Sequence, residues 1–128
     1  MGRVVLDSSV LIALYDKTDT HHQNVMQKFE QNLDQYEIST LTITEVLTSP
    51  MTVLAQSKER IIHALKIAIA ELHPVTEEIA MRAADVRVKT GLKTPDAIIS
   101  ATATLAGAEL WTLDQKLAKA HTGAVLIA

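Results

Sequence analysis

Short runs of hydrophobic residues alternate along the chain with longer segments in which apolar residues recur every three or four positions. The short runs are typical of strands and the longer segments of amphipathic helices. The pattern predicts five strands, at residues 3–7, 37–41, 72–75, 109–113 and 124–127. It predicts helices between them, at residues 8–14, 19–34, 42–49, 57–70, 76–90, 94–106 and 114–120. Strands separated by helices form parallel sheets through right-handed crossovers, so we expect an α/β fold with helices on both faces.

Several helix boundaries carry local signals. Thr76 precedes two acidic residues and predicts a helix start, and Gly91 predicts its end. Pro95 stands at the first position of the next helix, where proline is favoured. Pro50 should end the helix that Thr42 opens, because the residue before a proline avoids the α region. No repeat, low-complexity segment or linker interrupts the series, so we expect one domain spanning residues 1–128.

Composition agrees with a compact domain. The chain has 128 residues, of which 48% are hydrophobic and 21% charged, enough for a real core. Cysteine is absent, which excludes disulfides and thiolate zinc sites and is compatible with the cytoplasm. The first apolar run is too short for a signal peptide, and no run reaches the roughly 18 apolar residues of a membrane helix. We therefore expect a cytoplasmic protein that does not enter the membrane.

Four acidic residues stand at or near the points where a predicted strand gives way to a helix: Asp7, Glu45, Asp96 and Asp114. In a parallel sheet these points share one edge, so folding should bring the four side chains together. Carboxylates that converge repel each other unless a cation lies between them. Carboxylate oxygens suit Mg²⁺ and Mn²⁺, and the five histidines show no zinc-binding spacing.

Taken singly, most of these acids have a structural explanation. Glu45 forms a capping-box pattern with Thr42, Asp96 lies in the first turn of its helix, and Asp114 is placed as an N-cap. Asp7 favours a functional role, because the two serines that follow it are available as caps. Ser9 and Thr112 each lie two residues from an acid and are placed either to orient it or to serve as cap and strand residues.

Charge and aromatic content limit how the chain could bind nucleic acid. The formal net charge is −3, so no overall basic surface is expected, but residues 82–93 hold four basic residues against the single acid Asp85. Only four aromatic residues occur, so a base-stacking platform is not expected.

The motifs around the acids resemble those of a known family. The segments are VVLDSSVLI at residues 4–12, TE at 44–45, KTPDAII at 93–99 and LWTLD at 110–114. In order and spacing they are similar to the motifs of PIN-domain ribonucleases, and closest to VapC-type toxins of toxin–antitoxin pairs. The resemblance spans essentially the whole chain. It implies a three-layer α/β/α fold with sheet order 3-2-1-4-5. It also implies an Mg²⁺- or Mn²⁺-dependent endoribonuclease that cleaves RNA, forms homodimers and is neutralised by a cognate antitoxin.

By position, the resemblance makes Asp7, Glu45, Asp96 and Asp114 the catalytic acids. Asp7 and Asp96 would bind the metal, with Glu45 and Asp114 binding it directly or through water. Ser9 and Thr112 would be supporting residues. Many relatives carry another acid where this chain has Lys116. Lys93 and Lys116 would contact substrate phosphate, and the number of metal ions, one or two, stays open.

Two alternatives remain at this stage. One is a catalytically silent PIN-like module that binds protein or RNA. The other is a phosphoacceptor receiver domain, which has similar length and alternation. A receiver domain typically pairs two acids after its first strand, whereas here two serines follow Asp7.

Overall fold

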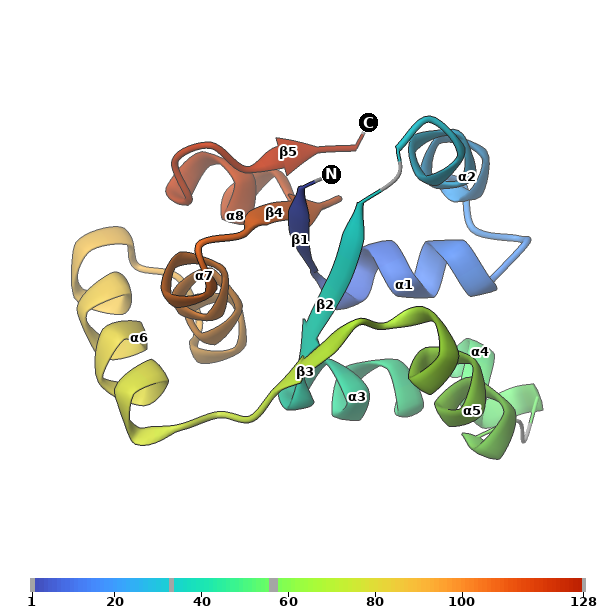
Figure 1. The fold of residues 1–128 in the computed structure, drawn as a ribbon, viewed down its shortest axis with the longest axis horizontal. Coiled ribbons are helices and arrows are strands. Elements are labelled where there is room, and N and C mark those ends of the chain that lie inside the picture. The colour runs from blue at the N-terminus through green and yellow to red at the C-terminus, as the bar shows by residue number, and fades with distance from the viewer. Residues whose placement is uncertain (1, 33, 56–57, 128) are drawn as a thin grey trace.

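The structure is a computed structural model that describes residues 2–32, 34–55 and 58–127 (Figure 1). Five parallel strands form one sheet in the order β3-β2-β1-β4-β5. The strands are β1 (Arg3–Leu6), β2 (Gln35–Ser39), β3 (Glu71–His73), β4 (Glu109–Thr112) and β5 (Val125–Leu126). The predicted α/β class, the parallel sheet and its order are therefore confirmed.

Helices cover both faces of the sheet. They are α1 (Ser8–Tyr15), α2 (His22–Glu30), α3 (Thr40–Leu47), α4 (Pro50–Ala55), α5 (Lys58–Ala68), α6 (Glu77–Thr90), α7 (Thr94–Ala106) and α8 (Gln115–Ala120). Figure 1 shows α6, α7 and α8 on one side of the sheet and α1 to α5 on the other. Among the described residues, no helix is long and apolar enough to cross a membrane.

Alternation along the central strand separates the two cores. Val4 and Leu6 point into the core under α1, α2, α3 and α5, whereas Val5 points into the core under α6 and α7. All three side chains are at most 1% exposed. Successive residues of a strand face opposite sides, so an unbroken apolar run is what a strand buried on both faces requires.

Helix α7 lies against the sheet because its buried positions are small. Ala97, Ala101 and Ala103 are fully buried beside Ile99, and α6 packs against α7. The predicted boundaries of α6 are confirmed: the Thr76 hydroxyl accepts a hydrogen bond from the Ile79 amide, and Gly91 ends the helix with φ of 73°. Glycine suits that position because side chains disfavour positive φ.

Several predicted boundaries were wrong by a few residues, and one helix was missed. Helix α3 begins at Thr40 because the Ser39 hydroxyl caps it by accepting from the Leu41 amide at 3.1 Å. The capping box proposed for Thr42 is therefore wrong. Pro50 does follow the end of that helix but also begins α4, which the sequence pattern did not separate. The predicted start of the next helix at Ser57 lies outside the described residues.

The second predicted helix, 19–34, was too long. Helix α2 covers His22–Glu30, and the Asp19 carboxylate instead accepts from the His21 amide in a turn before it. Strand β2 begins at Gln35, two residues earlier than predicted, because Gln35 pairs with Arg3 of β1. The remaining strands match their predictions to within two residues.

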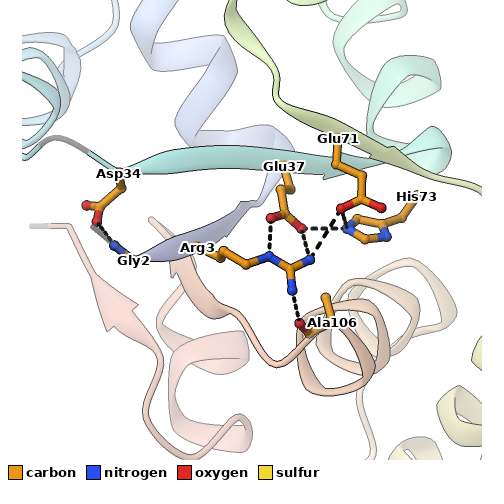
Figure 2. A network of polar contacts seen from close by, with 7 residues as sticks. All are labelled: Gly2, Arg3, Asp34, Glu37, Glu71, His73 and Ala106. Carbon is orange, nitrogen blue, oxygen red and sulfur yellow. Dashed lines mark hydrogen bonds and ion pairs between the residues drawn. The ribbon is translucent and has the colours of Figure 1, made fainter.

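A polar network links side chains of β1, β2 and β3 to one another (Figure 2). Glu37 of β2 is 1% exposed and accepts from Arg3 Nε at 2.6 Å and Arg3 Nη2 at 2.9 Å. His73 Nε2 lies 2.7 Å from the same carboxylate, and Arg3 Nη1 donates to the carbonyl of Ala106 at the end of α7. Arg3 thus links strands β1 and β2 to the last turn of α7, and the carboxylate of Glu37 is buried with its charge neutralised.

Burial opposes ionisation of Glu37, but the hydrogen bonds from Arg3 and His73 outweigh it and lower the pKa of its carboxyl below the usual value. A lowered folded-state pKa adds stability that is complete above the unfolded-state pKa. That stability is lost as pH falls through the lower, folded-state pKa.

Glu37→Gln should lower the free energy of unfolding at neutral pH by about 1–2 kcal/mol, because it removes the charge that Arg3 and His73 bind. It should also flatten the acid limb of a plot of that free energy against pH. Chemical denaturation followed by circular dichroism across the acid range measures both effects. Glu71→Gln is the matched control, because Glu71 is 55% exposed and its contact with Arg3 is longer, at 3.3 Å. An acid limb equally steep in both variants would contradict the assignment.

Candidate functional site

Asp7 lies at the end of β1 and is 5% exposed. Its carboxylate accepts three hydrogen bonds: Oδ1 from the Ser8 amide at 2.9 Å, and Oδ2 from the Ser9 and Thr112 hydroxyls, both at 2.8 Å. Asp7, rather than Ser8 or Ser9, is therefore the N-cap of α1, which corrects the reason given for setting it apart. The two hydroxyl bonds go beyond capping, because they fix the carboxylate between β1 and β4.

The two hydroxyls that bind Asp7 also form hydrogen bonds with the loop that follows β4. The Ser9 hydroxyl accepts from the Leu113 amide at 3.1 Å, and the Thr112 hydroxyl accepts from the Asp114 amide at 3.0 Å. Ser9 and Thr112 are thus each bonded to both Asp7 and the backbone near Asp114. Ser9 donates to the acid two residues before it, as its spacing predicted, whereas Thr112 donates to Asp7 and not to the carboxylate of Asp114.

Asp114 is the N-cap of α8, as its spacing indicated. Its Oδ1 accepts from the amides of Lys116, at 2.8 Å, and Leu117, at 3.3 Å. Both of these bonds use the same carboxylate oxygen. A capping role and a ligand role are therefore compatible in this residue.

Glu45 reaches the same region from α3. Burial raises the pKa of its carboxyl above the usual value, the charges of Asp7 and Asp96 raise it further, and a hydrogen bond with Ser8 opposes them. Its Oε1 atom is buried and, in the described part of the chain, has no hydrogen-bond partner. A buried oxygen without a donor is costly unless a ligand satisfies it.

Asp96 is the third residue of α7, directly after Pro95. Burial is the largest cause that raises the pKa of its carboxyl above the usual value, followed by the charges of Asp7 and Asp114. The ammonium groups of Lys116 and Lys93 act in the opposite direction. Asp96 is therefore within electrostatic reach of two acids and of two lysines.

The structure thus brings the four acids within electrostatic reach of one another. Asp7 acts on Glu45 and Asp96, and Asp96 is also acted on by Asp114. We call these four residues the acidic cluster. Their donor atoms are all oxygens. Burial and then the like charges raise the pKa values of Glu45 and Asp96, and one buried oxygen of Glu45 has no hydrogen-bond partner among the described residues. This donor set fits a hard divalent cation such as Mg²⁺ or Mn²⁺.

A tighter group of possible ligands lies elsewhere. Within the described residues, Glu37, Glu71 and His73 have donor atoms all within 4.8 Å of one another. The Arg3 guanidinium already supplies positive charge there and bonds to both glutamates. We therefore assign this group to the structure of the sheet rather than to a metal. Among the described residues, no salt bridge reaches the acidic cluster, and Lys93 and Lys116 act on Asp96 only through their charges.

Sequence reasoning missed the part played by Ser8, which it treated as a cap. Ser8 donates its amide to Asp7, and its side chain hydrogen-bonds Glu45. The signal was the order Asp7-Ser8-Ser9, in which the acid itself takes the cap position.

In the basic segment of residues 82–93, Arg87 Nε donates to the Leu92 carbonyl at 3.0 Å and so fixes the α6–α7 turn.

Comparison with known proteins agrees with this architecture. Comparison with curated protein sequences gave no match. A toxin–antitoxin complex from Klebsiella pneumoniae has a chain that is 29% identical, with a TM-score of 0.83 and 98% of each chain covered.

More distant structures share the fold. The toxin VapC20 of Mycobacterium tuberculosis, described as cleaving the sarcin-ricin loop, is 17% identical, with a TM-score of 0.75 and coverage of 91% of this chain and 94% of that one. VapBC2 from Rickettsia felis, solved with a DNA fragment from its promoter, is 19% identical, with a TM-score of 0.67 and coverage of 97% and 96%.

The family comparison covers almost the whole chain. Residues 4–122 match the PIN domain, a span that includes all four members of the acidic cluster and both hydroxyls that bind Asp7. With the sheet order and the structural neighbours, this match shows that the chain belongs to the PIN-domain family.

Proposed function

We propose that the protein is an Mg²⁺- or Mn²⁺-dependent endoribonuclease and the toxin of a type II toxin–antitoxin pair. The observation that carries the proposal is the acidic cluster of a PIN domain, with a buried Glu45 oxygen that lacks a hydrogen-bond partner within the described ranges. The resemblance to a chain from a toxin–antitoxin complex supports the toxin role.

In this proposal Asp7 and Asp96 bind the metal, and Glu45 and Asp114 bind it directly or through water. A divalent cation held there would act as a Lewis acid, lowering the pKa of water and stabilising the negative charge that develops at phosphorus. Ser9 and Thr112 hold Asp7 in one orientation through hydrogen bonds of 2.8 Å, so this ligand needs no reorganisation when the cation binds.

The remaining polar residues would position RNA. Lys93 and Lys116 act on Asp96 electrostatically, so they lie beside the cluster and are placed to bind a phosphate oxygen. The positive charge of Lys116 also disfavours a second cation nearby, and we therefore favour a single metal ion.

The proposed partners follow from the same assignment. An antitoxin would block the cluster by presenting a basic side chain to the carboxylates. We further propose a cytoplasmic homodimer built from this single domain. A catalytically silent PIN module is the second candidate, but the orienting bonds to Asp7 favour an active site.

Asp96→Asn should reduce RNA cleavage about a hundredfold or more, because it removes one of the two principal metal ligands while keeping the side chain's shape. A gel assay of purified protein with cellular RNA, with Mg²⁺, Mn²⁺ or a chelator, measures this loss. Asp85→Asn is the matched control, since Asp85 is an exposed acid on α6. Undiminished cleavage by Asp96→Asn would refute the assignment.

Substitutions at Asp114 separate capping from catalysis. Asp114→Ser should keep the free energy of unfolding within about 0.5 kcal/mol, because serine also caps helices, yet it should reduce cleavage. Asp114→Ala should lose about 1 kcal/mol as well as activity. Denaturant unfolding and the same cleavage assay provide the two measurements. Full activity in the serine variant would restrict Asp114 to capping.

Metal binding can be measured without RNA. Isothermal titration with Mn²⁺ should show binding to the wild type and a clear loss of affinity in Glu45→Gln, because the amide removes the charge of a half-buried ligand. Glu78→Gln, an exposed change on α6, should leave the affinity unchanged. If the wild type binds no Mn²⁺, the silent-module alternative replaces the proposed enzyme.

A further inference from the structure

A second polar surface begins where the acidic cluster ends. A hollow of about 380 Å³ lies between the α6–α7 turn and α8 and is lined by Thr90, Leu92, Lys116, Lys119 and Ala120. We call it the α8 hollow. No acidic residue lines it in the described part of the chain. Its two charged residues are both basic, although the protein as a whole carries a net charge of −3.

Helix α8 connects this hollow directly to the acidic cluster. Asp114 caps the helix, the amide of Lys116 bonds to that cap, and Lys119 follows one turn later. Residues three positions apart on a helix are neighbours, with Cβ atoms about 5–6 Å apart. The two ammonium groups therefore extend along one side of α8, with Lys116 next to the cluster and Lys119 farther from it.

Helix stability does not explain the position of Lys116. A cation in the first turn of a helix opposes the helix dipole, whereas Lys119 in the last turn complements it. Lys116 is exposed, and its charge reaches Asp96. Lys116 is unfavourable for its own helix, and it faces a hollow beside the proposed site of phosphodiester cleavage. Binding of an anion in the hollow would explain its position.

The opposite wall of the hollow is held in place. Leu92 is fully buried, and its amide donates to the Thr90 hydroxyl at 3.2 Å while its carbonyl accepts from Arg87. The ligand would therefore meet a fixed, uncharged wall on one side and two lysines on the other. Such a surface suits a single phosphate group with its bridging oxygens, which offers acceptors and needs no base contact.

We propose that the α8 hollow binds a backbone phosphate of the RNA substrate, adjacent to the phosphate that is cleaved. This inference rests on the proposed ribonuclease function. It adds the direction of the bound RNA, which would run from the acidic cluster along α8. Phosphate contacts give affinity but carry no sequence information. The hollow therefore contributes salt-dependent binding, and the choice of RNA sequence lies with other residues.

Lys119→Gln tests the hollow without changing the acidic cluster. Binding of a fluorescein-labelled single-stranded RNA of mixed sequence is measured by anisotropy over a series of chloride concentrations, with chelator present to prevent cleavage. The variant should bind more weakly, and the slope of log affinity against log salt should become shallower by about 0.7, as expected for one lost phosphate contact. In the Lys116→Gln, Lys119→Gln double variant, the reduction of this slope should be about twice as large.

Lys66→Gln is the matched control, because Lys66 is an exposed lysine on α5, over the opposite face of the sheet. Its salt slope and RNA affinity should equal those of the wild type. Mn²⁺ affinity should be the same in wild type and Lys119→Gln, which separates a lost phosphate contact from a damaged metal site. A Lys119→Gln slope equal to that of Lys66→Gln would overturn the proposal.

Further arms identify the occupant and separate the two proposals. Inorganic phosphate should displace RNA no better than chloride at the same ionic strength. Much stronger displacement would assign the hollow to a free phosphate ion and overturn the RNA assignment. If the wild type cleaves RNA and Lys119→Gln binds RNA normally, the hollow is refuted and the nuclease stands. If binding depends on Lys119 but the wild type never cleaves, the hollow stands and the nuclease fails. Absence of any RNA binding by the wild type would refute both.

Discussion

The carboxylate of Asp7 is the point on which both the sheet and the candidate site depend. It is almost completely buried, so its charge is tolerated only because three donors, from Ser8, Ser9 and Thr112, surround it. These donors belong to the start of α1 and the end of β4. The hydrogen bonds that satisfy this buried charge also link β1 to β4. The same bonds hold the carboxylate in one orientation at the edge of the sheet, as the candidate site requires.

The protein contains two groups of acids that differ in how their charge is balanced. Around Glu37, the guanidinium of Arg3 lies within hydrogen-bond distance of both carboxylate oxygens, and the pKa of Glu37 is lowered. In the acidic cluster, the pKa values of Glu45 and Asp96 are raised, and a Glu45 oxygen has no hydrogen-bond partner in the part of the chain that the structure describes. In the first group, the charge of Glu37 is balanced by Arg3, so no added ligand is needed. The second would be stabilised by an added cation, and this difference in charge balance, rather than the closeness of the atoms, distinguishes the candidate site.

Sequence reasoning predicted the architecture well because its signals were local and mutually consistent. The unbroken run Val4-Val5-Leu6 indicated a central strand, and Thr76 and Gly91 marked the ends of α6. It failed where neighbouring residues compete for one role. The sequence pattern placed the start of α3 at Thr42, whereas Ser39, the last residue of β2 to pair with β3, is its cap.

The site was predictable as a set of residues but not as a set of contacts. The strand-to-helix positions of the four acids follow from the alternation of elements. The bond from Thr112 to Asp7 spans 105 residues, and the orphaned oxygen of Glu45 depends on how α3 packs; neither leaves a local signal. The α8 hollow was equally invisible, because it combines the end of α6 with one side of a helix too short to show periodicity.

The central place of β1 has a consequence for the chain as it leaves the ribosome. β1 is made before its neighbour β4, which comes more than a hundred residues later along the chain, and the edge of β1 that pairs with β4 stays unpaired until then. Thr112 and Asp114 are made equally late. Until then Asp7 lacks the hydrogen bond from Thr112, and the acidic cluster lacks Asp114. Pairings so distant in sequence form late. A nascent chain that has exposed β1, α1 and α3 therefore presents no assembled site until the segment that carries Thr112 and Asp114 has also been made.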